Sequence, residues 1–141
     1  MAQGDGALYN DFKEQLLKGL IDLDGHTLKM IIVTGYTPNI DSHAGYSDVS
    51  STEVSGTGYT AGGATLGSPG VTQDNSNDRA LFDAADVTWN SLSLGQTPSH
   101  AILYDDTHAS KCLIAYWEVT TVTNGGNYTL QFDALGLISL S

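Results

Sequence analysis

Hydrophobic residues recur at helical spacing near the start of the chain. Leu8, Phe12 and Leu16 are four positions apart, with mostly polar residues between them. This spacing places the three side chains on one face of a helix. Gly19 can close such a helix in the left-handed conformation. The pattern therefore predicts one short amphipathic helix over residues 7–19.

Most of the remaining apolar residues fall into short runs that are typical of strands. The first run, Leu28–Val33, is apolar on both faces, as in a buried strand. After a polar turn at residues 74–78, further runs cover residues 80–84, 86–90, 101–104, 111–122, 127–132 and 135–140. Short strands separated by Gly, Pro, Asn and Asp are typical of antiparallel folds. We expect a single, mainly β domain over residues 1–141, an antiparallel β-sandwich or jelly-roll-like barrel with one short N-terminal α-helix.

The run at residues 111–122 is unusual because neither of its faces is polar. Leu113 and Trp117 belong to one face, and Ile114 and Tyr116 belong to the other. A strand of this kind either lies at the centre of the fold or buries its second face against another subunit. The sequence leaves both explanations open.

Two glycine-rich segments separate these patterns. Residues 34–73 are rich in Gly, Ser and Thr, with short strands expected at Ser50–Val54 and Gly63–Leu66. A structureless excursion of this length would be unusual in a compact domain, so we expect much of it to be ordered against another surface. The second segment, Asn124-Gly125-Gly126, predicts a tight hairpin between the strands on either side.

The charge composition limits the partners that the chain can bind. Five lysines and arginines stand against 16 aspartates and glutamates, which leaves a net charge of −11. Binding to nucleic acid, and docking on an anionic membrane, both depend on clustered basic residues. We therefore expect no direct nucleic-acid partner and no membrane partner. The acidity indicates either solubility or complementarity to a basic partner surface.

The single cysteine and the first residues indicate the compartment. Cys112 excludes an internal disulfide and lies in a strand pattern, where a buried, inert thiol is common. The N-terminus lacks the basic patch and apolar run of a signal peptide, and no stretch approaches the ~20 apolar residues of a membrane span. The sequence predicts a soluble protein made in a cytoplasm.

The motifs that resemble catalytic or metal sites are incomplete. The segment Gly56–Gly62 lacks the Lys-Ser/Thr ending of a P-loop and the spacing of a dinucleotide-binding loop. Asp74, Ser76 and Asp78 have the spacing that opens a calcium loop, but Arg79 stands where the loop requires glycine. A polar turn is the better interpretation.

The histidines also lack a complete site. His43 lies near Asp41 and Asp48, and His108 lies near Asp105 and Asp106, without a second ligand-bearing element. The four histidines show no zinc spacing, and no serine lies in a nucleophile elbow. We expect no cofactor, no metal and no enzymatic activity.

Several segments are distinctive as sequence. They are residues 8–17, 21–24 and 28–30, the Gly-Tyr-Thr-Ala-Gly-Gly motif within residues 53–63, residues 78–89 with Asp-Val-Thr-Trp, and residues 101–105 and 113–116. These segments resemble a group of small structural proteins of tailed phages and prophages. The resemblance covers nearly the whole chain, and it implies a virion component encoded among head and tail genes.

Within this group we expect a head decoration (cement) protein. It would bind the outer surface of the phage head, stabilise contacts between neighbouring copies of the major capsid protein, and form a homo-oligomer, with a trimer as one option. The expected capsid contacts are the N-terminal segment Ala2–Tyr9, which includes a mobile arm at residues 1–6, and the glycine-rich loop Thr57–Gly63, because such segments can order on a partner. The predicted partner-binding residues are Leu8, Tyr9, Thr57, Gly58, Tyr59, Thr60, Gly62 and Gly63.

Two alternatives remain open. A tail- or fibre-associated module would recognise a host-surface glycan, with Tyr36, Tyr46, Tyr59, Trp89 and Trp117 as stacking platforms. A head–tail connector component would form a ring of defined copy number.

Overall fold

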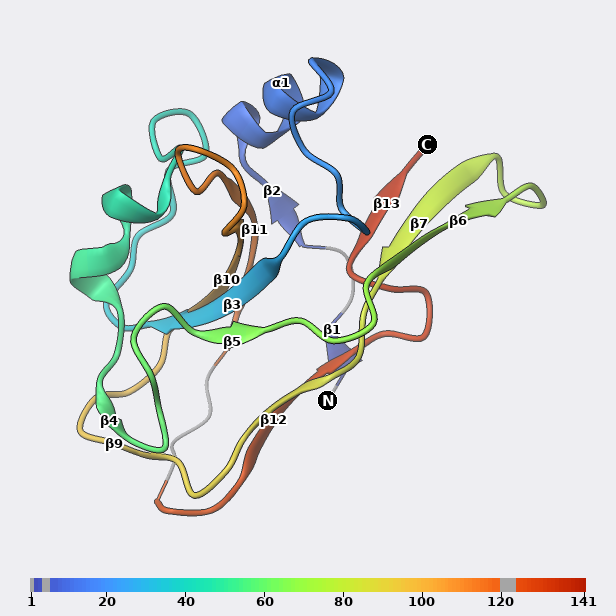
Figure 1. Ribbon diagram of the computed structural model, residues 1–141. Helices are drawn as coiled ribbons and strands as arrows, with labels where there is room; N and C mark the ends of the chain where they lie inside the picture. The colour runs from blue at the N-terminus through green and yellow to red at the C-terminus, as the bar shows by residue number, and fades with distance from the viewer. Residues whose placement is uncertain (1, 4–5, 120–123) are drawn as a thin grey trace.

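The structure is a computed structural model that describes residues 2–3, 6–119 and 124–141. Strands make up 40% of it and helix makes up 11%. The prediction of a mainly β fold with one short α-helix is confirmed (Figure 1). Several antiparallel sheets are present in an arrangement compatible with a β-sandwich, and over the described residues no sheet closes into a barrel.

Short strands follow one another with little helix between them. The helices are α1 (Asn10–Leu17) and the 3₁₀ helices η1 (Tyr46–Asp48) and η2 (Ser50–Thr52). The strands are β1 (Ala2–Gln3), β2 (Ala7–Leu8), β3 (Leu28–Val33), β4 (Gly56–Thr57), β5 (Ala64–Thr65), β6 (Gly70–Asp74), β7 (Arg79–Asp83), β8 (Val87–Trp89), β9 (Ser93–Leu94), β10 (His100–Asp105), β11 (Leu113–Glu118), β12 (Tyr128–Phe132) and β13 (Ile138–Leu140).

A five-stranded sheet in the order β2-β11-β10-β3-β5 forms the centre of the molecule. Every pair of neighbours in this sheet is antiparallel. All six residues of β10 are buried, and β3 has the bounds that its apolar run predicts. Strands with two apolar faces belong at the middle of a sheet that is covered on both sides, which is where β3 and β10 lie.

The central sheet also explains the two apolar faces of β11. This strand lies between β2 and β10, with Leu113 and Ile114 fully buried and Trp117 5% exposed. The first of the two explanations, a central position, therefore applies. Burial of the second face needs no other subunit.

Over the described residues, β11 and β12 do not pair as the hairpin predicted at Asn124-Gly125-Gly126 requires, and residues 120–123, which this hairpin would include, lie outside the described residues. The next strand, β12, pairs with β8 and β1 in a separate three-stranded sheet, and Asn124 bridges to Ser93. The position beside β11 that a hairpin would fill is taken by β2, from the start of the chain. Pairing over a long sequence distance thus prevails over the local turn signal.

The N-terminal segment is paired to the sheets. Ala2 and Gln3 lie parallel to Gln131 and Phe132, and the Gly6 amide donates to the Leu137 carbonyl at 2.9 Å. These backbone bonds replace the mobile arm that was expected at residues 1–6, of which residues 1, 4 and 5 lie outside the described residues.

The helix is shorter than the predicted range of 7–19. Ala7 and Leu8 form β2 instead, because their backbone pairs with Tyr116 and Ala115 of β11. The end of the helix follows the prediction: Gly19 has φ +74°, and its amide donates to the Leu16 carbonyl at 3.0 Å. The Leu20 amide reaches the Gln15 carbonyl at 3.0 Å, which completes a Schellman closure.

The Gly/Ser/Thr-rich excursion at residues 34–73 is ordered against the central sheet, as expected. The Val54 amide donates to the Ile32 carbonyl at 3.0 Å, and the Thr34 amide donates to the Thr52 carbonyl at 2.8 Å. A strand was expected at Ser50–Val54, but Ser50–Thr52 is the 3₁₀ helix η2. The strand expected near Gly63–Leu66 is β5.

Candidate binding surface

A three-stranded sheet in the order β13-β7-β6 projects from the body of the molecule (Figure 1). Its register aligns Ile138, Phe82 and Val71 across the three strands, with Leu140 beside Ala80 in the next row on the same face. Because side chains alternate between faces along a strand, these five apolar residues share one face. The sheet β13-β7-β6 therefore has one apolar face that other residues must bury.

Helix α1 and the loop after it cover this face incompletely. Phe82 and Ile138 are buried, but Val71 is 46% exposed and Leu140 is 62% exposed. An open groove of about 870 Å³ remains between the sheet, α1 and the loop, which we call the apolar groove. It is lined by Leu8, Phe12, Lys13, Leu16, Leu17, Gly19, Ile21, Asp22, Leu23, Asp24, Val71, Ala80, Leu81, Phe82, Ile138 and Leu140.

Two leucines at the end of α1 are exposed, and one of them, Leu17, also lines the groove. Leu17 at the end of α1 is 90% exposed, and Leu20 just after the helix is 52% exposed. Contiguous apolar side chains at the surface of a soluble domain mark a contact site more often than isolated ones do. No sequence pattern singles out Leu17, because it lies beside the Leu8-Phe12-Leu16 stripe and not on it.

Two acidic side chains, Asp22 and Asp24, are among the residues that line the groove. Asp22 and Asp24 lie side by side, and a hydrogen bond with the Asp22 carboxyl group raises the pKa of Asp24. The described ion pairs of Lys18, Lys29, Arg79 and Lys111 are with other carboxylates. The remaining basic side chain, Lys13, lies in the groove with its Nζ atom 3.4 Å from Asn10 Oδ1.

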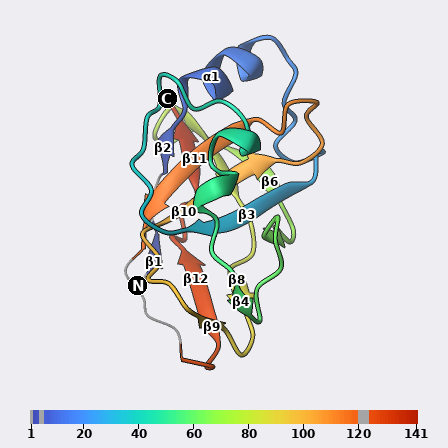
Figure 2. The same cartoon turned by 90° about the vertical axis from the view of Figure 1, so that its left-hand side faces the viewer.

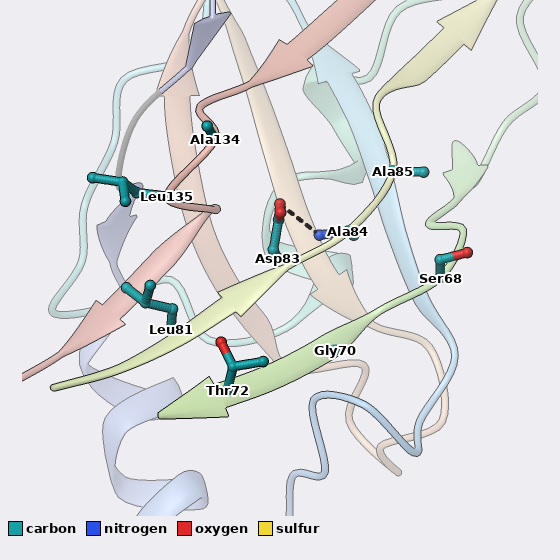
Figure 3. A pocket seen from close by; sticks show the side chains of 9 residues that line it. All are labelled: Ser68, Gly70, Thr72, Leu81, Asp83, Ala84, Ala85, Ala134 and Leu135. Atoms are coloured by element: carbon teal, nitrogen blue, oxygen red, sulfur yellow. Dashed lines mark hydrogen bonds between the residues drawn. The ribbon is translucent and has the colours of Figure 1, made fainter. Parts of the chain in front are cut away.

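A second, smaller pocket of about 430 Å³ lies on the opposite face of the same sheet (Figure 3). Gly70, Thr72 and Asp83, which alternate with the groove-facing residues, contribute to its lining, and Leu81 contributes to the lining of both cavities. Its one carboxylate, Asp83, accepts the Ala84 amide at 2.8 Å. A single carboxylate already bonded to the backbone offers neither a metal site nor an acid–base pair.

The predicted contact residues at the start of the chain have different environments. Leu8 is half-buried and lines the apolar groove. Tyr9 is fully buried, and its hydroxyl lies 2.8 Å from the Tyr36 hydroxyl, which lies 2.8 Å from His43 Nδ1. Burial raises the pKa of Tyr9 well above its usual range. Tyr9 is therefore part of the core, and its prediction as a surface contact is wrong.

The glycine-rich loop is held in place by a carboxylate. Glu53 accepts hydrogen bonds from the Tyr46 hydroxyl, from the Tyr59 hydroxyl at 2.6 Å and from the Gly62 amide at 2.8 Å. The Tyr104 hydroxyl donates to the Gly62 carbonyl at 2.7 Å. These bonds order the loop on the molecule itself.

Close packing explains why this loop contains glycine. Gly63 has φ +84°, and a Cβ atom there would lie 2.1 Å from the Met30 carbonyl oxygen. Gly58 has φ +82°, and a Cβ atom there would lie 2.6 Å from the Asn90 carbonyl oxygen and 2.7 Å from the Ser91 carbonyl oxygen. Left-handed backbone conformations and close backbone approach both favour glycine.

The predicted contact residues do not form one surface. Thr57, Gly58 and Thr60 are exposed, whereas Tyr59, Gly62 and Gly63 are half-buried. Figures 1 and 2 place β4, where this loop starts, at the end of the molecule opposite α1. The exposed residues of the loop thus lie far from Leu8 and the apolar groove.

The reactive side chains of the described residues lie in separate environments. Over these residues, no three His, Cys, Asp or Glu side chains are placed to hold a metal ion. Burial raises the pKa of the Cys112 thiol to about 12, so the thiol stays protonated at neutral pH. The Ser99 Oγ atom lies 3.1 Å from His100 Nδ1, but His100 is buried against the rings of Tyr36 and Tyr116, and neither residue lines the two pockets.

Comparisons with known proteins add no family assignment. No protein-family model matches the chain, and searches of curated proteins and of solved structures give no match. Within the described residues, no helix has the length and apolar character to cross a membrane. The resemblance to phage structural proteins therefore stays a prediction.

Proposed function

We propose that the protein is a non-enzymatic structural component of a phage head, a decoration or cement protein that binds the major capsid protein on the outer surface. The resemblance in the sequence supports this class of protein. The observation that carries the proposal is the apolar groove, where Leu17 and Leu140 are exposed beside the buried Phe82 and Ile138. A partner that covers this groove gains hydrophobic stabilisation without any chemical step.

The protein does not depend on a partner to bury its described core. The described core is closed within a single chain, with β3, β10 and β11 buried. Capsid binding therefore does not have to complete the core and adds only the contacts of the groove. Burying one exposed leucine contributes about 1.5–3 kcal/mol at most, so a single contact is weak. Many identical contacts on a closed lattice add up to a strong clamp.

Co-sedimentation with bare, expanded phage heads tests the proposal. We expect the protein to sediment with heads and to raise the temperature at which they release DNA, because a ligand that binds only the assembled shell stabilises it. Leu140→Ser should weaken binding roughly five- to thirtyfold, which corresponds to about 1–2 kcal/mol of lost burial.

A matched control is available on the opposite face of the same sheet. Leu135 is 52% exposed and lines the second pocket, so Leu135→Ser makes the same chemical change outside the apolar groove. Equal losses from both substitutions would count against the groove as the contact. Failure of the unaltered protein to sediment with heads would refute the capsid proposal itself.

The glycan-binding alternative has weaker structural support. Trp89 and Trp117 are each 5% exposed, and Tyr36 is 6% exposed. The Trp89 ring stacks between Tyr59 and Tyr128 within the protein. Rings used in this way do not offer a free face to a sugar. The connector alternative remains a prediction that native mass spectrometry tests through its ring of defined copy number.

A further inference from the structure

We infer that the apolar groove receives an amphipathic helix of the partner protein, and that a lysine or arginine of this helix lies beside Asp22 and Asp24. The inference deepens the proposed function, on which it rests for the identity of the partner. It specifies the chemistry that the partner must present.

The shape of the surface favours a helix as the occupant. The groove floor is one face of a three-stranded sheet, and α1, with eight residues, covers only part of it. A sheet face is commonly covered by helices that lie side by side. A second helix placed next to α1 would cover Val71 and Leu140 and would contact Leu17 at the rim. Helices in such grooves use apolar anchors spaced by about one turn.

The charges favour a basic residue at one end of that helix. Neither Asp22 nor Asp24 belongs to any ion pair between described residues, and all five lysines and arginines are among those residues. The hydrogen bond with Asp22 raises the pKa of Asp24, and the repulsion between the two carboxylates acts in the same direction. A cation from outside would favour both charges, whereas a second copy of this chain would bring a net charge of −11 to the contact.

A synthetic peptide probe tests this chemistry directly. The probe is a fluorescein-labelled amphipathic helical peptide of leucine, alanine and glutamine with one arginine near one end, and its partner peptide has glutamate in place of the arginine. Binding is measured by fluorescence anisotropy. We expect the arginine peptide to bind roughly tenfold more tightly than the glutamate peptide. The double variant Asp22→Asn/Asp24→Asn should bind both peptides about equally.

A control separates the local effect from the effect of net charge. The double variant Glu118→Gln/Asp133→Asn removes two carboxylates that do not line the groove, and it should keep the preference for arginine. Circular dichroism should show that all variants unfold at temperatures close to that of the parent. Equal binding of the two peptides to the parent, or a preference that the Asp22/Asp24 variant keeps, would overturn the inference.

Other occupants give different outcomes. If the parent sediments as a dimer that Leu140→Glu dissociates, a second copy fills the groove and the inference is wrong. If the parent binds phosphatidylcholine vesicles and the peptides do not compete, a lipid fills it, with the same consequence.

Co-sedimentation with phage heads distinguishes this inference from the proposed function. Heads that bind the parent and the Asp22/Asp24 variant equally would refute the inference and keep the function. Heads that bind neither, while the arginine preference holds, would refute the function and keep the inference.

Discussion

Substitution of Gly63 by alanine gives a test of how the glycine-rich loop is ordered. Gly63 has φ +84°, and an added Cβ atom would lie 2.1 Å from the Met30 carbonyl oxygen and 2.8 Å from Ile31 Cγ2. The first contact is with the backbone of β3, at the centre of the main sheet, which cannot move aside cheaply. The substitution therefore combines backbone strain with a steric clash.

The two effects can be estimated separately. A left-handed conformation costs an alanine about 1–2 kcal/mol relative to glycine. Overpacking against a fixed neighbour adds about 1–3 kcal/mol. The free energy of unfolding should thus fall by about 2–5 kcal/mol, a large part of the total stability of a domain of this size.

Gly125→Ala is the matched control. Gly125 has φ +87°, and among the described residues outside its two chain neighbours no heavy atom lies within 4 Å of the position of its Cβ. This variant should show the strain alone, so that the difference between the two variants measures the clash. Urea unfolding followed by circular dichroism gives both values. Equal losses in the two variants would refute the claim that the loop packs on Met30.

Three further predictions concern polar and titratable groups. Glu53→Gln should lower the free energy of unfolding by about 1–3 kcal/mol, because Glu53 accepts hydrogen bonds from two tyrosines and the Gly62 amide. Urea unfolding measures this loss, with Glu118→Gln at an exposed position as the control. Equal losses in the two variants would contradict the prediction. Cys112, with its pKa raised to about 12 by burial, should resist Ellman's reagent at pH 8 until urea unfolds the protein, and rapid labelling of the folded protein would show that the thiol is accessible. Burial lowers the pKa of His100, so the folded protein holds its proton less tightly than the unfolded chain does. The contribution of neutral His100 to stability is therefore complete above its ordinary pKa of 6.5 and is lost as the pH falls through the lower pKa of the folded protein. Thermal unfolding scans between pH 7 and 5 test this, because His100→Gln should make the melting temperature depend less on pH.

A second titratable group, Asp48, should also lower the stability of the protein at acidic pH. Two backbone amides, those of Gly45 and Ala44, lower the pKa of Asp48. A lowered carboxyl pKa gives stability that is present above the ordinary value of 3.8 and is lost as the pH falls below it. Asp48→Asn should flatten the loss below pH 4, and an unchanged profile would assign that loss to other carboxylates.

Local patterns predicted the elements whose environment is set by neighbours in sequence. The run Leu28–Val33 is β3, the polar turn at residues 74–78 joins β6 to β7, and Gly19 closes α1. Each depends on interactions within a few residues, namely side-chain alternation, turn chemistry and helix closure. The strand β6 was missed because Gly70–Asp74 lacks apolar alternation, and its pairing with β7 defines it instead.

The candidate site could hardly be predicted from the sequence, because it also depends on segments that are distant in the chain. Of the predicted contact residues, Leu8 lines the groove, Tyr9 is in the core, and the glycine-rich loop lies elsewhere. Exposure of Leu17 and Leu140 depends on how far α1 extends over a sheet whose strands begin more than fifty positions later in the chain. No local pattern contains that information.

The sequence by itself determined the mainly β class, the single short helix near the start, the acidic surface and the buried character of β3 and Cys112. These properties follow from composition and from periodicities that act over a few residues. Only the tertiary structure decided that β2 and not β12 lies beside β11, that glycines at residues 58 and 63 allow close packing, and that an apolar groove stays open beside α1. Each of these depends on which distant segments compete for the same sheet edge or face, and that competition is resolved by packing energy that no short stretch of sequence expresses.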